Sequence, residues 1–262
     1  MYNLKVDCHT HTIHTAHAYS TIAENVTIAA EKGLEAIAIT DHFGLQLSWF
    51  QPGREYNLEN HLKPANLPKI MGGVRVFKGV EIDIVDFDGT LAGSEMPIAR
   101  NSLVKSENYA DFILNTKDMV IASLHYFHGH RGGTVNQNTQ MYINVLARKN
   151  VDILGHPTRC GLEFHWPAVV DAAKRHGKML EINNETLRSR PHQAKTERHL
   201  AQLCAEAGVP IVVGSDAHIC YNVGEFALAI DLLTEIGFPE ELIASRSLAA
   251  FEAALGQARG RL

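Results

Sequence analysis

Short, mostly apolar segments alternate with longer amphipathic segments along this chain. The apolar segments are only a few residues long, and most are followed by a stretch with helical spacing. Strands that are apolar at successive positions and alternate with helices are typical of a parallel sheet with both faces covered. The predicted strands are Leu4–Cys8, Ala36–Thr40, Val74–Val80, Met119–Leu124, Val151–Leu154, Met179–Ile182 and Pro210–Val213.

Helical spacing fills most of the connections between these strands. The first helix is predicted over Thr21–Lys32, with Ser20 or Thr21 as its N-cap and Gly33 as its stop. Further helices are predicted near 137–149, 166–176, 194–207, 223–236 and 247–258. Seven strands that alternate with helices favour an α/β fold, a closed or nearly closed (β/α) barrel formed by residues 1–262 as a single domain.

The pattern of apolar and polar residues does not assign a role to the connection 43–73 or to the helix near 247–258. The connection 43–73 is the longest irregular segment, and we expect a helix or a lid over the barrel there. The terminal helix near 247–258 has an apolar side that would pack either on the barrel or on a partner, so the oligomeric state stays open.

Composition and charge narrow the class of protein. The net charge of −5 disfavours a groove for long nucleic acid, which needs an excess of Lys and Arg. No apolar run is long enough to cross a membrane, and the early polar residues do not resemble a signal peptide. The four cysteines form no C-x-x-C pair, so neither a disulfide framework nor a zinc ribbon is expected. These features predict a soluble cytoplasmic protein.

Histidine is enriched in this chain, and its positions matter more than its number. There are 15 histidines, where ordinary composition predicts about six. Six of the seven predicted strands end next to a potential metal ligand, at the barrel edge where active sites are built. The motifs are Asp7-Cys8-His9-Thr10-His11 with His17, Thr40-Asp41-His42, Gly79-Val80-Glu81, Leu124-His125, Gly155-His156-Pro157 and Gly214-Ser215-Asp216-Ala217-His218.

These residue types indicate a metal centre with more than one ion. His9 and His11 are two residues apart, so both can lie on one side of a strand and bind one ion, and Asp216 and His218 repeat this spacing. Imidazole nitrogen and carboxylate oxygen suit zinc, manganese or iron. Glu81 can bridge two ions with its two oxygens. Each motif alone has an ordinary explanation as a cap or turn, but six such strand ends together favour metal binding.

Read in order, these motifs resemble the polymerase and histidinol phosphatase (PHP) family. The resemblance covers roughly residues 4–255, and three segments are similar to its YcdX-like phosphatase branch. It implies a distorted (β/α)7 barrel with three divalent metal ions. The segments of the branch are His17-Ala18-Tyr19-Ser20-Thr21, Leu180-Glu181-Ile182-Asn183-Asn184 and Gly214-Ser215-Asp216.

The resemblance also implies how nine side chains share the three ions. The first ion would be held by His9, His11, Glu81 and Asp216. Glu81 would bridge to a second ion, held also by His125 and His156. His17, His42 and His218 would hold the third.

The hypothesis for function is hydrolysis of a small phosphate monoester. A hydroxide that bridges two ions would attack phosphorus, while the ions neutralise the developing charge. Glu81, Asp216 and His218 are the predicted catalytic residues. We expect further residues to support this centre. Asp7 and Asp41 would orient ligand imidazoles, and Arg159 and Arg190 would bind the phosphate.

Three alternatives stay open at this stage. A nucleotide phosphatase or 3′–5′ exonuclease would use the same centre on another phosphate ester. An amidohydrolase shares the barrel and the H-x-H opening, but that class uses a strand-end lysine where this chain has Glu81, and Lys78 would face the other side of its strand. A non-catalytic metal-binding module would hold its ions without an open coordination position.

Overall fold

Strands of two parallel sheets form the centre of the molecule. The computed structural model describes residues 2–44, 61, 66–98, 106, 108–125 and 132–260. One sheet has the order β1-β2-β5-β4 and the other the order β10-β9-β8-β7-β6-β3. All the pairs are parallel except β4 with β5. The strands are β1 (Val6–Thr10), β2 (Ala36–Ile39), β3 (His42–Phe43), β4 (Ile70–Met71), β5 (Val74–Lys78), β6 (Glu81–Asp83), β7 (Ile121–Ser123), β8 (Ile153–Gly155), β9 (Met179–Asn183) and β10 (Ile211–Gly214).

The two sheets close into one distorted (β/α)7 barrel, as the sequence predicts. Where the first and last strands meet, the amide of His11 donates to the carbonyl of Ala217 (2.8 Å), and the amide of Asp216 donates to the carbonyl of His9 (2.8 Å). At the other junction the chain passes directly from β2 to β3 and from β5 to β6. Each of these two consecutive strand pairs therefore contributes one strand to each sheet.

The split between β5 and β6 corrects the predicted strand Val74–Val80. The strand ends at Lys78, and Glu81 begins a separate strand in the other sheet. Gly79 lies at this break, where a Cβ atom would approach the Cγ2 of Thr40 to 2.6 Å. The absence of a side chain at Gly79 therefore lets the β5–β6 connection lie close to the β2–β3 connection.

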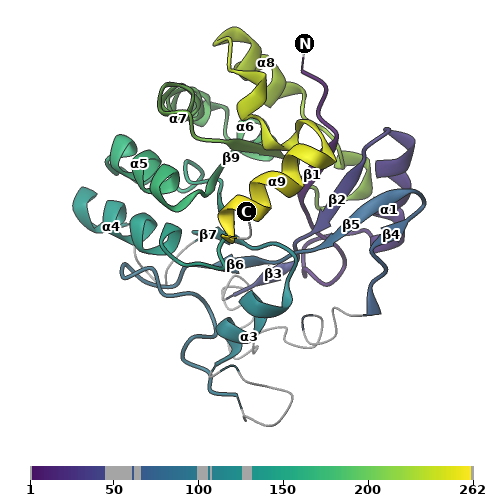
Figure 1. Cartoon of the computed structure of the whole chain (residues 1–262), viewed down its shortest axis with the longest axis horizontal. Coiled ribbons are helices and arrows are strands. Elements are labelled where there is room, and N and C mark those ends of the chain that lie inside the picture. The colour runs from purple at the N-terminus through teal and green to yellow at the C-terminus, as the bar shows by residue number, and fades with distance from the viewer. Residues whose placement is uncertain are drawn as a thin grey trace.

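Helices surround the barrel, and Figure 1 shows α4, α5, α7 and α8 ranged along one side of it. The N-cap of α1 is Thr21, which forms a capping box with Glu24. The helices predicted at 166–176 and 194–207 have those bounds, whereas α3 and α6 were not predicted. The helices are α1 (Ile22–Glu31), α3 (Tyr109–Thr116), α4 (Val135–Leu146), α5 (Trp166–His176), α6 (Asn184–Ser189), α7 (Ala194–Ala207), α8 (Ala227–Glu235) and α9 (Leu248–Ala258).

The last helix, α9, packs on the barrel rather than leaving its apolar side free. Phe251 and Leu255 join the cluster of buried residues that fills the barrel interior. The ring of Phe251 meets that of Phe77 edge-on, with centroids 5.3 Å apart. Figure 1 shows α9 lying across the middle of the view, over the strands. A second and larger buried cluster lies between the strands and the surrounding helices.

Inward-facing positions of the strands change from apolar to polar along the barrel axis. Ile121 on β7 and Met179 on β9 belong to the apolar interior cluster. Two residues further on, Ser123 and Glu181 follow them, and both are fully buried. Since residues i and i+2 share a face, one end of the barrel interior is sealed by apolar side chains, and the other end carries polar chemistry.

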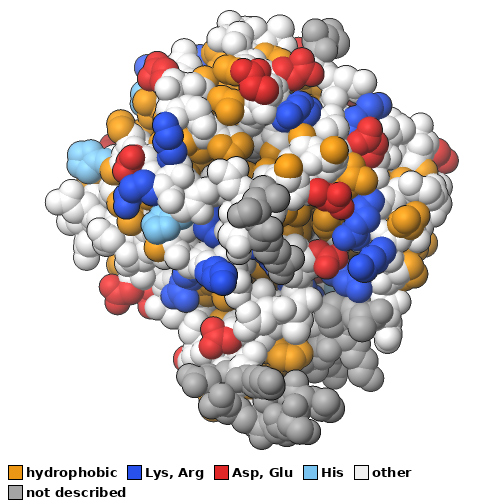
Figure 2. All heavy atoms as spheres, viewed as in Figure 1, with side chains coloured by type: hydrophobic (Ala, Val, Ile, Leu, Met, Phe, Trp, Pro, Cys, Tyr) orange, Lys and Arg blue, Asp and Glu red, His pale blue; other side chains and the backbone are white. Residues whose placement is uncertain are grey.

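Most of the connection 43–73 lies outside the described residues, so the predicted helix or lid there stays a prediction. Among the described residues, no helix is long and apolar enough to cross a membrane. Basic and acidic side chains are interspersed over the face drawn in Figure 2. The four cysteines are free, as their spacing predicts.

Candidate metal centre

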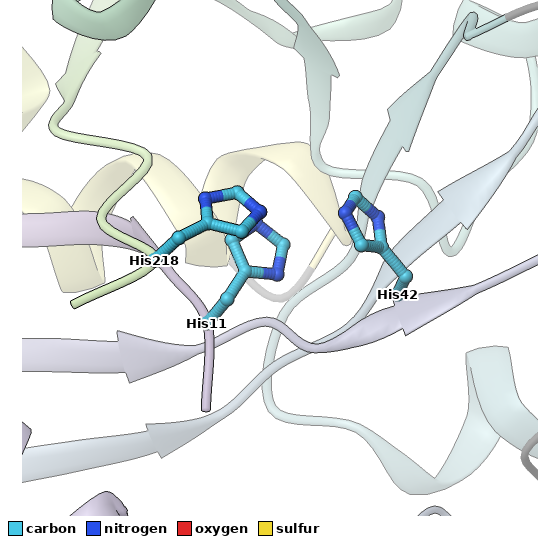
Figure 3. A group of neighbouring side chains, drawn as sticks. All are labelled: His11, His42 and His218. Atoms are coloured by element: carbon cyan, nitrogen blue, oxygen red, sulfur yellow. The ribbon is translucent and has the colours of Figure 1, made fainter. Parts of the chain in front are cut away.

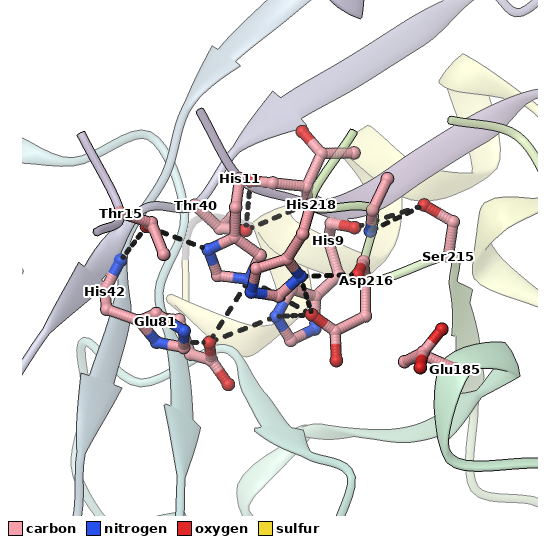
Figure 4. Close-up of polar contacts among 12 residues, drawn as sticks. His9, His11, Thr15, Thr40, His42, Glu81, Glu185, Ser215, Asp216 and His218 are labelled. Atoms are coloured by element: carbon pink, nitrogen blue, oxygen red, sulfur yellow. Dashed lines mark hydrogen bonds and ion pairs between the residues drawn. The ribbon is translucent and has the colours of Figure 1, made fainter. Parts of the chain in front are cut away.

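The predicted ligands lie together at the carboxyl ends of the strands. Figure 4 shows side chains from β1, β3, β6 and the segment after β10 turned toward one another. Five groups of side chains in the described residues have ligand atoms within 4.8 Å of one another. They are His11, His42 and His218; His9, His156 and Asp216; His9, His11 and Glu81; His42, Asp83 and His125; and Glu81, His125 and His156.

The first predicted set is assembled as expected. The Nε2 atom of His9 lies 3.2 Å from Oε2 of Glu81 and 3.5 Å from Oδ1 of Asp216. The Nε2 atom of His11 lies 3.4 Å and 3.1 Å from the same two oxygens. Ligands about 2.0–2.1 Å from a tetrahedral zinc ion are separated by roughly 3.3 Å. The four atoms therefore have the mutual spacing that one ion requires.

The second predicted set is formed on the other oxygen of Glu81. Oε1 of Glu81 lies 2.8 Å from Nε2 of His156 and 3.4 Å from Nε2 of His125. One carboxylate thus directs one oxygen to each set, which is the arrangement a bridging ligand needs.

The third set differs from the prediction in one member. The rings of His42 and His218 lie 4.3 Å and 4.2 Å from the ring of His11, and Figure 3 shows the three together. The ring of His17 is 4.5 Å from that of His218 and 5.3 Å from that of His42. His17 is exposed, and its ring closes this group from the solvent side, outside the groups with close ligand atoms. Its expected role as a ligand stays a prediction.

Unpartnered polar atoms give the test of whether these residues fit metal ions. Buried donors and acceptors in proteins almost always have a hydrogen-bond partner, yet eight buried ligand atoms here have none. The residues that carry these atoms lie together in the five groups given above, so they fit a cluster of cations. The atoms are Nε2 of His9, His11, His125 and His218, Nδ1 of His42 and His156, Oε2 of Glu81 and Oδ1 of Asp216.

Apart from His156, whose Nε2 contacts Oε1 of Glu81 (2.8 Å), the opposite ring nitrogen has a partner in four of these histidines. Nδ1 of His9 contacts Oε1 of Glu181 (2.8 Å), and Nδ1 of His125 contacts Oδ1 of Asp83 (2.8 Å). Nδ1 of His218 contacts the carbonyl of Asp216 (3.0 Å). A partner on one ring nitrogen fixes the ring and directs the lone pair of the other nitrogen toward an ion.

The fourth of these histidines is His11, and its partner leads to Asp41. Nδ1 of His11 lies 3.3 Å from the hydroxyl of Thr15, which donates to Oδ1 of Asp41 (2.9 Å). Asp41 also accepts from the amide and hydroxyl of Thr12 (2.6 and 2.8 Å). The predicted support by Asp41 is therefore exerted through Thr15 rather than by direct contact with an imidazole.

The predicted support by Asp7 for a ligand imidazole has no direct contact behind it in the described residues, and it stays a prediction. Its carboxylate accepts from the backbone amides of Ser215 (3.1 Å), Gly224 (2.8 Å) and His9 (3.4 Å), and contacts no imidazole in the described part of the chain. Asp7 instead anchors the loop after β10 to β1. Among the carboxylates outside the predicted ligands, those that contact imidazoles are Glu181 and Asp83, which face inward on β9 and β6. Glu181 could have been found from the sequence, because it lies two residues after Met179 on β9 and so faces the barrel interior as Met179 does.

The first residue of the G-H-P motif and of the G-S-D motif has to be glycine, because a neighbouring side chain occupies the space that a Cβ atom would need. A Cβ atom at Gly155 would lie 2.1 Å from the hydroxyl oxygen of Ser123. One at Gly214 would lie 2.3 Å from Oε1 of Glu181. His156 and Asp216, which belong to these two motifs, have positive φ angles of 22° and 55°. Non-glycine residues rarely adopt this region, and such strain is typical of functional sites.

Charge in the centre favours bound cations. Burial opposes ionisation of Glu81, but the surrounding histidines hold the pKa of this carboxyl well below its usual value. Although burial acts in the opposite direction, Glu81 and Asp83 raise the pKa of His125 to about 9. Burial lowers the pKa of His156 to about 4, so this imidazole is neutral and able to ligate. Ionised carboxylates and neutral imidazoles are the forms that bind divalent ions, so an ion at His125 would have to displace the proton that its raised pKa retains at neutral pH.

A cavity of about 310 Å³ opens beside this centre. Asp216 and His218 line it, together with the predicted phosphate-binding residues Arg159 and Arg190. The guanidinium of Arg159 is largely committed to the protein, because its Nη2 donates to Asp216 and to Asn183 (2.8 Å). The guanidinium of Arg190 donates to the carbonyl of Arg159. Whether either arginine binds a substrate stays a prediction.

The comparisons with known proteins agree with this fold and site. The model of the PHP domain matches residues 7–187. A probable phosphatase of Caldanaerobacter subterraneus subsp. tengcongensis is 38% identical over 260 residues, which cover 99% of this chain and 94% of the relative. A probable phosphatase of Acetivibrio thermocellus is 35% identical over 257 residues, 98% of this chain and 97% of the relative.

A solved structure shares the fold at lower identity. It is a histidinol phosphate phosphatase from Lactococcus lactis subsp. lactis complexed with zinc, L-histidinol and phosphate. It aligns with a TM-score of 0.61 and 20% identity over 90% of this chain and 94% of that one.

A parallel barrel with a polar carboxyl end and clustered nitrogen and oxygen ligands defines a metal-dependent hydrolase of the phosphoesterase class. The chain belongs to the PHP domain family. The amidohydrolase and non-catalytic alternatives find no support in these comparisons.

Proposed function

We propose that this protein hydrolyses a small phosphate monoester at a centre of three divalent ions. The observation that carries the proposal is the set of eight buried atoms that lack partners, all on residues that lie together as predicted ligands. The ligand sets are those the sequence predicts, with Glu81 between the first and second, and His17, His42 and His218 for the third. Zinc suits these nitrogen and oxygen donors, with manganese or iron as alternatives.

The ions, when bound, would lower the pKa of a water molecule and neutralise charge on a phosphate. The protein has to hold the ligands rigidly and present the substrate. Glu81 is central because both of its oxygens face histidines, within 3.4 Å of Nε2 in each of His11 and His125. Asp216 is oriented by the guanidinium of Arg159. Asp216 and His218 also line the cavity, which supports their assignment, with Glu81, as catalytic residues.

The cavity supports a small, anionic substrate. Its volume of about 310 Å³ is at the low end of the range for small-molecule sites. Arg159 and Arg190 line it, and a guanidinium is well suited to bind a phosphate. Within the described residues, Nη1 of Arg159 makes no hydrogen bond, so its N–H groups are available to the substrate. We also propose a cytoplasmic location, as the sequence predicts.

The test compares Glu81→Ala with Glu206→Ala, a change of an exposed glutamate on α7. Metal content and hydrolysis of an aryl phosphate are measured for both variants after loading with each ion. We expect Glu81→Ala to lose bound metal and to lose activity on the order of 100-fold or more, and the control to behave as wild type. Full activity of Glu81→Ala in metal-depleted buffer would refute the proposed centre.

A screen of phosphate esters then identifies the substrate class. We expect small monoesters to be cleaved, and single-stranded DNA to be left intact. Preference for nucleotides or for DNA ends would support the nucleotide phosphatase or exonuclease alternative instead.

A further inference from the structure

A second cavity is separate from the one beside the metal centre, and none of its lining residues is a predicted metal ligand or phosphate-binding residue. Its volume is about 270 Å³, and it shares no lining residue with the cavity beside the metal centre. Its charged and polar walls come from the end of β5, the end of α3 and the segment after β2. Side chains that line it include Lys78, Lys117, His61, Asp41, Ile39 and Leu67.

Lys117 is the unusual residue of this cavity. It is only 6% exposed, and it follows the last residue of α3. Its backbone is held in place, because its amide donates to Ile113 (3.2 Å) and its carbonyl accepts from Arg259 (2.9 Å). Its ammonium group forms no hydrogen bond or ion pair with any residue in the described part of the chain. The ammonium is not among the fully buried polar atoms, so it keeps some accessible surface where Lys117 lines the cavity, and a ligand that supplied a negative charge there would be stabilised.

The protein charges around Lys117 do not supply that partner. Both oxygens of Asp41 accept hydrogen bonds from Thr12, and one accepts a further bond from Thr15. Asp118 accepts from the backbone amide of Lys78 (3.1 Å). Burial lowers the pKa of Lys117 to about 8, although Asp41 and Asp118 act in the opposite direction.

A second lysine faces the same cavity. Lys78 is the last residue of β5, and its side chain is half-buried. It acts on Lys117 in the sense expected of a neighbouring like charge. Two ammonium groups that line one small cavity repel each other, and an anion between them would remove that repulsion.

His61 adds a requirement for the ligand. Its Nε2 atom lies 3.3 Å from the carbonyl oxygen of His42, so Nε2 carries the hydrogen and donates it. In the neutral ring Nδ1 is then an acceptor, and this buried atom has no partner. A ligand that satisfies both lysines and His61 must combine negative oxygens with a hydroxyl donor.

We propose that this cavity binds a small oxyanion that retains a proton, with hydrogen phosphate as the simplest example. The phosphate oxygens accept from Lys117 and Lys78, and the P–OH group donates to Nδ1 of His61. The apolar side chains of Ile39 and Leu67 limit the space beside the anion. Sulfate has the same size and charge but no proton at neutral pH, so it leaves His61 unpaired and binds more weakly.

The experiment measures phosphate binding to the metal-loaded protein by isothermal titration calorimetry at pH 7 and constant ionic strength. Wild type is compared with Lys117→Met, Lys78→Met and Lys174→Met, a change of an exposed lysine on α5. Binding at the metal centre is common to all four proteins. We expect Lys117→Met and Lys78→Met to lose one binding event or to weaken it about tenfold or more, and Lys174→Met to match wild type.

The unfolding temperature of the Lys117 variant and the affinity for sulfate are measured as well. Without phosphate, Lys117→Met should unfold at a temperature equal to or above that of wild type, because a charge without a partner on a largely buried side chain has been removed. If Lys117→Met does not fold, Lys78→Met alone decides the question. Unchanged phosphate stoichiometry and affinity in the lysine variants would overturn the proposal, as would sulfate binding at this cavity as tightly as phosphate. Because no turnover is measured, this result is independent of the proposed phosphatase activity.

Discussion

The residues that surround a buried carboxyl group in this protein determine whether it is ionised. Glu81 and Glu197 are both fully buried carboxyl groups. Histidines surround Glu81 and keep it ionised, whereas Glu197 on α7 has only the hydroxyl of Thr158 as a partner (2.5 Å). Its other oxygen has no partner among the described residues. Burial, and to a lesser extent Glu181, raise the pKa of Glu197 to about 8.

Glu197 should make stability depend on pH. In the native state it keeps its proton up to about pH 8, while in the unfolded chain it loses the proton near its ordinary value of 4.5. The unfolded state therefore binds fewer protons across this interval, and the free energy of unfolding falls as pH rises. Glu197→Gln removes this penalty. We expect it to be more stable than wild type by up to roughly 4 kcal/mol at pH 8, with little difference at pH 5.

Thermal unfolding of both proteins from pH 5 to pH 8 measures this effect, and Glu206→Gln is the exposed control on the same helix. A difference between Glu197→Gln and wild type that did not change with pH would show that Glu197 is not protonated in the native state.

At the scale of the elements, α9 matters because it seals the apolar end of the barrel. Its C-cap residue, Arg259, is buried and binds both oxygens of Asp152 (2.8 and 2.6 Å) next to β8. The same guanidinium donates to the carbonyl of Lys117. One side chain thus ties the end of the chain to two connections beneath the strands.

Removal of this buried ion pair should cost far more than removal of an exposed one. We expect Arg259→Met to lower the free energy of unfolding by about 3–5 kcal/mol, because it leaves Asp152 buried without its partner. Arg175→Met removes an exposed pair with Asp171 (2.8 Å) on α5 and should cost at most about 0.5 kcal/mol. Urea unfolding measures both values. Equal effects of the two changes would mean that α9 is held by its apolar contacts alone.

Sequence alone predicted the elements that are long enough to show a period. The helices at 166–176 and 194–207 were found with their bounds, and the strands differ by a few residues at their ends. The short strands β3 and β6 could not be found, because two or three residues show no period.

The candidate site was predicted well where chemistry and position coincide. Histidine at a strand end is an unusual combination, and eight of the nine predicted ligands lie in the groups with close ligand atoms. Glu181 was missed because it lies inside a strand whose neighbours are apolar, and Asp83 because β6 itself was not foreseen. Which carboxylate contacts an imidazole depends on side-chain direction across the barrel, which sequence spacing does not give.

At the scale of the whole molecule, the protein is proposed to be one domain whose stability depends on its ions. We expect the metal-loaded and the chelator-treated protein each to unfold in a single calorimetric transition. The loaded form should unfold at the higher temperature, since an ion present at 100 times its Kd adds about 2.7 kcal/mol. Activity should disappear with the metal and return when zinc, manganese or iron is added. Two separate transitions would contradict the single domain, and equal transition temperatures would contradict metal binding by the folded state.

Closure of the barrel between β1 and the segment after β10 has a consequence for how the enzyme matures. His9 and His11 leave the ribosome long before Asp216 and His218, because most of the barrel lies between them in the sequence. The backbone contacts of His9 and His11 with Asp216 and Ala217 bring these distant segments together. A nascent chain therefore cannot hold the complete proposed set of ligands until Asp216 and His218 have emerged.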